Sequence, residues 1–307
     1  MKIIHSAAEF LDPTRKTCLA IGVFDGVHLG HQQVIRQTLD DARRHEARSV
    51  VVTFDRHPSA IVAPALAPLA IYSPAQKERA IAAMGVDALL FIRFDQAFSR
   101  IPGEQFIRDL AQDFGRLQSL CVGADFVFGH KRSGNVTLLR TLGQELGFTV
   151  HGLSAVCLDG DMVSSTRIRE SIRSGSLDAA SEMLGRAYSI SGAVTRGDGL
   201  GRKLGFPTAN LDTSGLLLPP NGVYAVHAMT EGIVHRAVVN IGFRPTLQKP
   251  EPQLRVEAHL LDYTSDLYGR ELELTFVEKI REEQRFPSIE ALQLQIAQDI
   301  ARATNCF

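Results

Sequence analysis

The segment Ala20-Ile-Gly-Val-Phe-Asp-Gly-Val-His-Leu-Gly-His31 decides how the first half of this 307-residue chain folds. The apolar residues that lead into it, from Leu19 to Val23, predict the end of a buried strand, and the residues after His31 predict a helix. Glycines at such a turn let the backbone approach a ligand, and the N-terminus of the helix attracts phosphate. Because His28 and His31 are one helical turn apart, both imidazoles can reach the same phosphate group. The segment therefore predicts a nucleotide-binding site that transfers a nucleotidyl group.

Composition limits the classes to which the protein can belong. The length suits two domains, and 45% hydrophobic residues are enough to build their cores. A net charge of −1 without a basic run argues against nucleic-acid binding. The sequence shows neither an apolar run of membrane-spanning length nor a signal-peptide pattern, so we expect a cytoplasmic protein with no membrane partner. The four cysteines form no CxxC pair, which argues against a zinc site and a disulfide framework.

In the first half of the chain, short apolar runs alternate with amphipathic segments such as Gln32–His45 and Pro74–Met84. This alternation predicts an α/β domain with a parallel sheet and helices on both faces, in which ligands bind at the carboxyl ends of the strands. The apolar runs cover residues 17–24, 49–54, 87–94, 119–123 and 148–157. The polar motifs at 22–31, 53–58 and 123–135 each follow such a run, so we expect them at the same edge of the sheet.

The second half is rich in short β-like runs separated by turns, which predicts an antiparallel barrel or sandwich. The runs are Tyr188–Thr195, Val223–Met229, His235–Ile241, Arg255–Leu261 and Glu271–Val277. A helix capped by Ser288 is expected to close the chain. Its shared apolar face is predicted to consist of Ile289, Leu292, Ile296 and Ile300. We place the boundary near Leu184–Ala187, which gives domains 1–184 and 185–307.

A second phosphate-binding segment is Val163-Ser-Ser-Thr-Arg-Ile-Arg169, which predicts the start of a helix. Its hydroxyls and free backbone N–H groups suit phosphate, and an arginine can contact phosphate through two N–H groups. Taken singly, the histidines are explained by a helix start and the serines by a helix cap. Together the two segments resemble the HxGH and SSTxxR motifs of the nucleotidylyltransferase superfamily. The resemblance implies catalytic roles for His28 and His31 and ATP contacts from Gly22, Phe24, Gly30, Ser164, Ser165, Thr166 and Arg167.

Two aromatic segments, Thr53-Phe-Asp-Arg-His-Pro58 and Gly123-Ala-Asp-Phe-Val-Phe-Gly129, resemble the flavin-side motifs of bacterial FAD synthetases. The resemblance implies that aromatic rings pack against the isoalloxazine ring, although any one of them is equally well explained as sheet core. The flavin-binding residues implied are Phe54, His57, Asp125, Phe126 and Phe128. This sequence departs from the family at Arg56, where a proline is usual before the histidine.

The segment Thr195-Arg-Gly-Asp-Gly-Leu-Gly-Arg-Lys-Leu-Gly-Phe-Pro-Thr-Ala-Asn-Leu211 is the main motif of the second half. Its glycines predict a loop that wraps phosphates with backbone N–H groups, although a flexible surface hairpin explains the glycines alone equally well. It is not a Walker A loop, because no Gly-Lys-Ser/Thr follows. The predicted ATP contacts are Gly197, Gly199, Gly201, Gly205, Thr208 and Asn210. Thr208 and Asn210 also offer the oxygen ligands that Mg²⁺ prefers.

This loop resembles the riboflavin kinase signature, and the whole chain is similar to the prokaryotic bifunctional riboflavin kinase/FMN adenylyltransferase family. The implied fold is a Rossmann-like nucleotidylyltransferase domain followed by a six-stranded antiparallel β-barrel with a C-terminal helix. Glu257 matches the family's catalytic glutamate. Strand alternation places Glu257 and His259 on one face, but on that pattern alone a surface glutamate is the simpler interpretation.

The resemblance implies two successive ATP-dependent reactions, from riboflavin to FMN and from FMN to FAD, with Mg²⁺ as the cofactor. A monofunctional enzyme and a flavin-sensing binding protein are the alternatives. The expected partners are small molecules alone, and the expected assembly is a monomer or a weak homo-oligomer.

Overall fold

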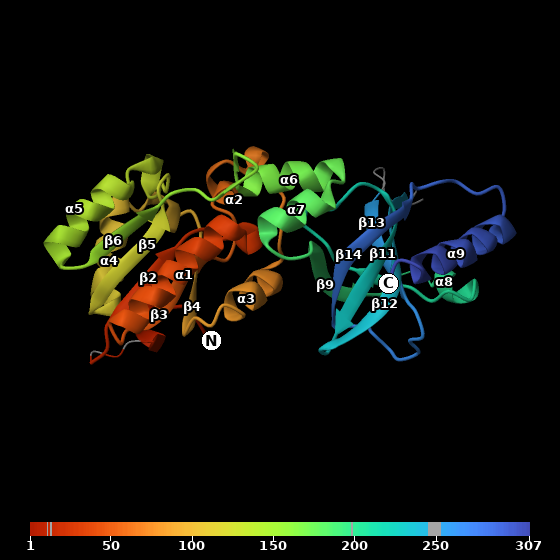
Figure 1. The fold of residues 1–307 in the computed structure, drawn as a ribbon, viewed down its shortest axis with the longest axis horizontal. Coiled ribbons are helices and arrows are strands. Elements are labelled where there is room, and N and C mark those ends of the chain that lie inside the picture. Colours follow the sequence, from red (N-terminus) through yellow and green to blue (C-terminus); the bar gives the residue numbers. More distant parts are fainter. Residues whose placement is uncertain (11, 13, 198, 245–252) are drawn as a thin grey trace. The chain divides into compact units, whose positions relative to one another are not determined.

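The structure is a computed structural model that describes residues 1–10, 12, 14–197, 199–244 and 253–307. The chain forms two compact units (Figure 1). The first comprises Met1–Ala70 and Pro74–Arg167, and the second comprises Ile71–Ser73 and Ile168–Phe307. The predicted domain boundary between residues 184 and 185 remains a prediction. The division into compact units falls between Arg167 and Ile168, so helix α7 (Leu177–Leu184) belongs to the second unit.

The first unit is built on a six-stranded parallel sheet with the order β1-β4-β3-β2-β5-β6, which confirms the predicted sheet type. The strands are β1 (Lys2–Ile4), β2 (Thr17–Ile21), β3 (Arg48–Phe54), β4 (Ala88–Ile92), β5 (Leu117–Gly123) and β6 (Thr149–Leu153). The sequence pattern did not predict the short edge strand β1. Strand β2 lies between β3 and β5, so the three segments that follow these strands meet at one edge.

Helices cover both faces of this sheet. Alternate residues of its buried strands point to opposite faces, so each strand contributes side chains to two separate cores. Leu19 and Val50 face a core shared with α4 (Gly103–Phe114) and α5 (Val136–Leu146). Ala20 and Val51 face the other core, with α1 (Leu29–Arg44) and α3 (Pro74–Ala82). The shorter elements are η1 (Ala7–Phe10), η2 (Asp25–Val27), α2 (Ser59–Val62), η3 (Pro64–Leu66), η4 (Phe98–Arg100), η5 (His130–Arg132), β7 (Cys157–Leu158), β8 (Asp161–Met162) and α6 (Ser165–Ser174).

The second unit contains a closed antiparallel barrel with the strand order β10-β13-β12-β11-β14-β9, in which β10 also pairs with β9. The strands are β9 (Ser189–Thr195), β10 (Ala209–Leu211), β11 (Gly222–Thr230), β12 (Ile233–Arg244), β13 (Gln253–Leu260) and β14 (Glu271–Arg281). Each predicted β run coincides with one of these strands. The additional strand, β10, contains Asn210 and follows the short helix α8 (Leu200–Lys203). Closure of the barrel leaves none of these six strands at an open edge in the described part of this unit.

Helix α9 (Ile289–Thr304) ends the chain, and its predicted cap is confirmed because the hydroxyl of Ser288 accepts a hydrogen bond from the backbone N–H of Ala291 at 3.2 Å. The predicted apolar face is wrong at Ile289, which is 57% exposed. The reason is that the C-terminal half of α9 makes the apolar contact, where Ile300 and Ala303 pack against Val223 of the barrel. No helix in the described part of the chain is long and apolar enough to cross a membrane.

The packing of α5 gives a test of the first unit. Leu142 is 1% exposed in the core beneath the sheet, whereas Leu146 at the end of the same helix is 40% exposed. We expect Leu142→Ala to lower the free energy of unfolding by about 2–5 kcal/mol, because it leaves a cavity. Leu146→Ala, the matched control, should cost about 1 kcal/mol or less. Urea unfolding followed by far-UV circular dichroism measures both, and equal losses would contradict this packing.

Candidate active sites

His28 and His31 come together at the start of α1, as the sequence predicts. Their rings stack with centroids 3.6 Å apart and an angle of 21° between the planes. His28 also caps the helix, because its Nδ1 accepts a hydrogen bond from the backbone N–H of His31 at 3.4 Å. The two imidazoles therefore lie together beside the helix N-terminus, where an anion is favoured.

The two glycines beside these histidines have a packing role. A Cβ on Gly22 would lie 3.0 Å from the Cζ atom of Phe24, and a Cβ on Gly30 would lie 3.2 Å from the Cε1 atom of His28. Phe24 is buried in a left-handed backbone conformation with φ 51°, and its ring contacts the His31 ring edge-on at 5.2 Å. The Phe24 ring thus packs against the His31 ring and helps to hold it in place. The predicted contact of Phe24 with ATP remains a prediction.

The serine-rich segment also reaches this turn. The Ser165 hydroxyl donates a hydrogen bond to the backbone carbonyl of Asp25 at 3.1 Å, which joins the start of α6 to the turn after β2. Ser164 accepts the N–H of Arg167 at 3.2 Å, and Thr166 is exposed. The Arg167 guanidinium is held by the β7–β8 hairpin through the carbonyl of Asp161 at 3.1 Å. Because a guanidinium has five N–H donors, Arg167 can keep this hydrogen bond and still contact a phosphate.

An aromatic cavity lies at the same edge of the sheet, where Phe54 ends β3 and where Phe126 and Phe128 follow β5. The rings of Phe126 and Phe128 stack 5.1 Å apart. Phe94 and Phe98 complete the aromatic wall, with Phe94 edge-on to Phe54 at 5.3 Å. The lining of the cavity is mainly apolar and also includes the basic residues Arg100, His130, Lys131 and Arg132.

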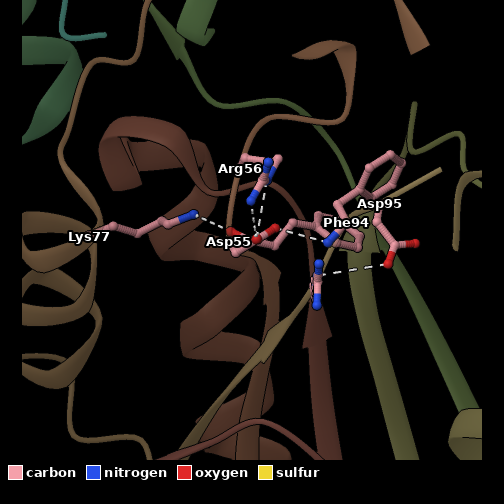
Figure 2. Close-up of polar contacts among 7 residues, drawn as sticks. Asp55, Arg56, Lys77, Phe94 and Asp95 are labelled. Carbon is pink, nitrogen blue, oxygen red and sulfur yellow. Dashed lines mark hydrogen bonds and ion pairs between the residues drawn. The ribbon is translucent and has the colours of Figure 1, made fainter. Parts of the chain in front are cut away.

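The polar flavin-side residues are placed differently from the rings. Among the described residues, His57 and Asp125 do not line the aromatic cavity: Asp125 is exposed, and the Nδ1 atom of His57 accepts the N–H of Ser59 at 3.2 Å. Arg56, which replaces the usual proline, is not among the described residues that line the cavity, and its guanidinium pairs with Asp55 at 3.0 Å (Figure 2). Burial raises the pKa of Asp55, but the N–H of Phe94 and the Arg56 guanidinium outweigh it and hold this pKa below its ordinary value.

The sequence analysis missed Phe94 and Phe98. The signal was present, because Phe94 ends the apolar run 87–94 and Phe98 comes shortly after it, so both follow the carboxyl end of β4 at Ile92. The rule that ligands bind at the carboxyl ends of parallel strands applies to β4 as much as to β3 and β5. What the sequence alone does not show is that the rings from β3, β4 and β5 meet in one cavity.

In the second unit, Glu257 lines a cavity together with Gly199, Gly201, Thr208 and Asn210. Barrel register brings Glu257 between Asn210 of β10 and Asn240 of β12. Asn240 also lines the cavity and was not predicted as a site residue. The strand alternation that buries Val256 and Ala258 places Glu257 on the opposite face of β13, where it is half-buried in the wall of this cavity.

The remaining glycines shape the loop around this cavity. A Cβ on Gly197 would collide with the Asn210 side chain, and a Cβ on Gly201 would collide with the backbone carbonyl of Phe206. Gly205 has φ +89°, which favours glycine. Within the described residues, Gly197 and Gly205 do not line the cavity, so the structure gives them a role in shaping the loop.

A buried ion pair forms another part of the wall. The Arg281 guanidinium of β14 donates to both carboxylate oxygens of Asp299 in α9, with the shortest N–O distance 2.8 Å. The two side chains are only 16% and 3% exposed. This pair joins the last helix to the barrel beside Phe286, Leu292 and Ile296. The sequence analysis missed it, because residues distant in the chain form it.

The oxygen atoms that line this cavity suit a hard cation that also binds phosphates. In the described part of the chain, no cluster of three or more His, Cys, Asp or Glu side chains is placed to hold a metal. The Thr208 hydroxyl and the Asn210 amide oxygen are neutral oxygen donors lining one cavity. Mg²⁺ is usually bound by few protein ligands together with substrate phosphates, so these residues fit it when a nucleotide supplies the other oxygens.

The fold and the two cavities define a two-unit nucleotide-dependent transferase. Residues 11–167 match the family described as FAD synthetase, and residues 184–307 match the riboflavin kinase family. The bifunctional riboflavin kinase/FMN adenylyltransferase of Escherichia coli (strain K12) is 38% identical over 100% of this chain and 98% of its own. That of Pseudomonas fluorescens is 38% identical over 95% and 94%. The chain belongs to the bifunctional riboflavin kinase/FMN adenylyltransferase family.

A solved structure shares the arrangement along the whole chain. It is described as a macrolide-efflux protein from Streptococcus pneumoniae and is 27% identical, with a TM-score of 0.81 over 99% of this chain and 98% of that chain. The likeness extends to both units, and the efflux description belongs to that protein.

The buried ion pair yields a stability prediction. We expect Asp299→Ala to cost about 3–5 kcal/mol, because it leaves the Arg281 charge buried without its partner. Glu282→Ala, which removes the exposed partner of Lys279, should cost about 1 kcal/mol or less. All 5 tyrosines lie in the second unit and the chain has no tryptophan, so tyrosine fluorescence during urea unfolding reports on this unit. Similar midpoints for the two variants would contradict a stabilising Arg281–Asp299 pair.

Proposed function

We propose that this chain makes FAD in two steps, phosphorylating riboflavin in the second unit and adenylylating FMN in the first. The observation that supports this most directly is that each unit has its own candidate site. Glu257 faces a loop-lined cavity in the barrel, and a stacked histidine pair stands at the same sheet edge as an aromatic cavity in the α/β unit. The two sites use different residues, so each reaction can be removed without the other.

In the kinase step, Glu257 takes the proton from the ribityl 5′-hydroxyl of riboflavin, and the hydroxyl oxygen attacks the γ-phosphorus of ATP. The bond to the β-phosphate oxygen breaks, and FMN and ADP are formed. Asn210 and Asn240, in register on either side of Glu257, support this role because their amides can orient the carboxylate or the phosphates. The glycine loop from 197 to 205 covers the phosphates with its N–H groups.

In the adenylylation step, a phosphate oxygen of FMN attacks the α-phosphorus of a second ATP, and pyrophosphate leaves as FAD forms. His28 and His31 donate hydrogen bonds to the phosphate oxygens as charge develops on them, assisted by the helix N-terminus. The remaining ATP contacts come from Gly22, Phe24, Gly30, Ser164, Ser165, Thr166 and Arg167. The isoalloxazine ring packs on Phe54, Phe126 and Phe128, with His57 and Asp125 as the predicted polar contacts of the flavin.

Mg²⁺ bound by Thr208 and Asn210 would neutralise phosphate charge in the kinase site. We further propose that the enzyme is cytoplasmic, works as a monomer or weak homo-oligomer, and has only small-molecule partners. Incubation of the purified protein with riboflavin, ATP and Mg²⁺, followed by separation of the flavins, tests the two-step proposal. Both FMN and FAD should accumulate with time. FMN alone would indicate a monofunctional enzyme, and bound flavin without ATP consumption would indicate a sensor.

Removal of the histidine pair should separate the two activities. The double variant His28→Ala/His31→Ala is expected to lose FAD formation from FMN by about 100-fold or more, because charge on the phosphates is no longer stabilised. Riboflavin phosphorylation by the same preparation is the control and should persist. Equal loss of both activities would contradict two independent sites.

The converse prediction concerns the barrel. Glu257→Gln keeps the size of the side chain but removes the base, so we expect riboflavin phosphorylation to fall by about 10²–10⁴-fold. FAD formation from supplied FMN should remain near the wild-type rate in the same sample. Normal kinase turnover in this variant would exclude Glu257 as the base.

A further inference from the structure

Lys77 is a buried cation that neither proposed reaction uses directly. It lies in α3 and is only 9% exposed. Its Nζ atom donates to the backbone carbonyl of Phe54 at 3.0 Å, and the Thr53 hydroxyl and the Val23 carbonyl both lie 3.4 Å away. Figure 2 shows the side chain reaching from its helix toward the segment that follows β3. Burial of an ammonium group is costly, so three converging oxygen acceptors indicate a specific purpose.

The three acceptors belong to both halves of the adenylylation site. Val23 begins the turn that carries Phe24, Asp25 and the histidine pair, whereas Thr53 and Phe54 end β3 and lead to the flavin cavity. The Thr53 hydroxyl donates to the same Val23 carbonyl at 3.0 Å, so lysine and threonine together connect the two strand ends. Both Val23 and Phe54 line the aromatic cavity.

Electrostatics makes this connection depend on the charge of Lys77. Burial lowers the pKa of Lys77 to about 8, while the charges of Asp25 on η2 and Asp55 after β3 act in the opposite direction. Arg56 is paired with Asp55, Glu78 and Arg79 lie on the helix of Lys77 itself, and the Nζ atom stands 5.5 Å from the centre of the Phe91 ring. Below about pH 8 the ammonium has three N–H donors, and above it the charge is lost.

We propose that Lys77 is a positioning residue for adenylyl transfer, whose protonated ammonium group holds the flavin-side end of β3 against the nucleotide-side turn after β2. This inference rests on the proposed adenylylation of FMN. In-line attack requires the FMN phosphate and the α-phosphorus of ATP to be aligned, and a shift of about 1 Å in such a site costs up to about 100-fold in rate. Lys77 acts on this alignment through the backbone, without touching either substrate.

The test compares Lys77→Met and Lys77→Arg with Lys2→Met, which removes an exposed positive charge from the same unit. At pH 7, Lys77→Met should lower kcat for FAD formation from FMN by about 10–100-fold with smaller changes in KM. Lys2→Met should match the wild type. Riboflavin phosphorylation should be unchanged in all variants, which shows that the second unit is folded, and an unchanged far-UV circular dichroism spectrum checks the fold of the first unit, which contains Lys77.

The pH profile separates positioning by charge from simple packing. Wild-type FAD formation should fall as pH rises through about 8, because Lys77 loses its proton there. Arginine stays charged throughout, so Lys77→Arg should retain activity and lose this fall between pH 7 and 9. The inference is overturned if Lys77→Met keeps the wild-type kcat, or if Lys77→Arg falls with the same midpoint as the wild type. Absence of FAD formation by the wild type would instead refute the proposed function.

Discussion

Parallel pairing of β2 with β3 on one side and β5 on the other is the constraint on which the first site depends. Parallel strands end at the same edge of a sheet, so the turns after all three strands converge wherever their sequences lie in the chain. The first of these turns leads to the histidines, the second begins directly after Phe54 at the end of β3, and the third carries Phe126 and Phe128. The hydrogen bond from Ser165 to Asp25 then adds the start of α6 to the same edge.

Closure of the barrel imposes the corresponding constraint on the second site. Strand β10 has only three residues, yet it pairs with both β9 and β13 and so closes the ring. Asn210 is consequently both a member of a strand and a lining residue of the cavity. A short strand between a glycine loop and β13 thereby fixes the loop, and the bulk of Asn210 explains why position 197 has no space for a side chain.

Periodicity and turn chemistry were sufficient to predict the sheet type, five of the six barrel strands and the cap at Ser288, but not the short strand β10. They failed for residues whose structure or burial depends on contacts with residues distant in the chain. Strand β1 is three residues long and acquires its structure by pairing with β4. Ile289 has the spacing of a buried residue but lies beyond the apolar contact of α9. The wall formed by Phe94 and Phe98, and the Arg281–Asp299 pair, follow from tertiary contacts that no local pattern encodes.

Lys77 shows the same limit most clearly. A lysine on an amphipathic helix is ordinarily solvated, and nothing in the sequence around it marks this one as buried. Only the sheet order places its ammonium group between the ends of β2 and β3, where carbonyl oxygens that strand pairing leaves available need a donor. The lysine that donates hydrogen bonds to these carbonyl oxygens at the sheet edge is thus also the group that holds the two substrate sites in alignment. A group that meets the hydrogen-bonding requirement of the sheet edge is therefore positioned to control that alignment.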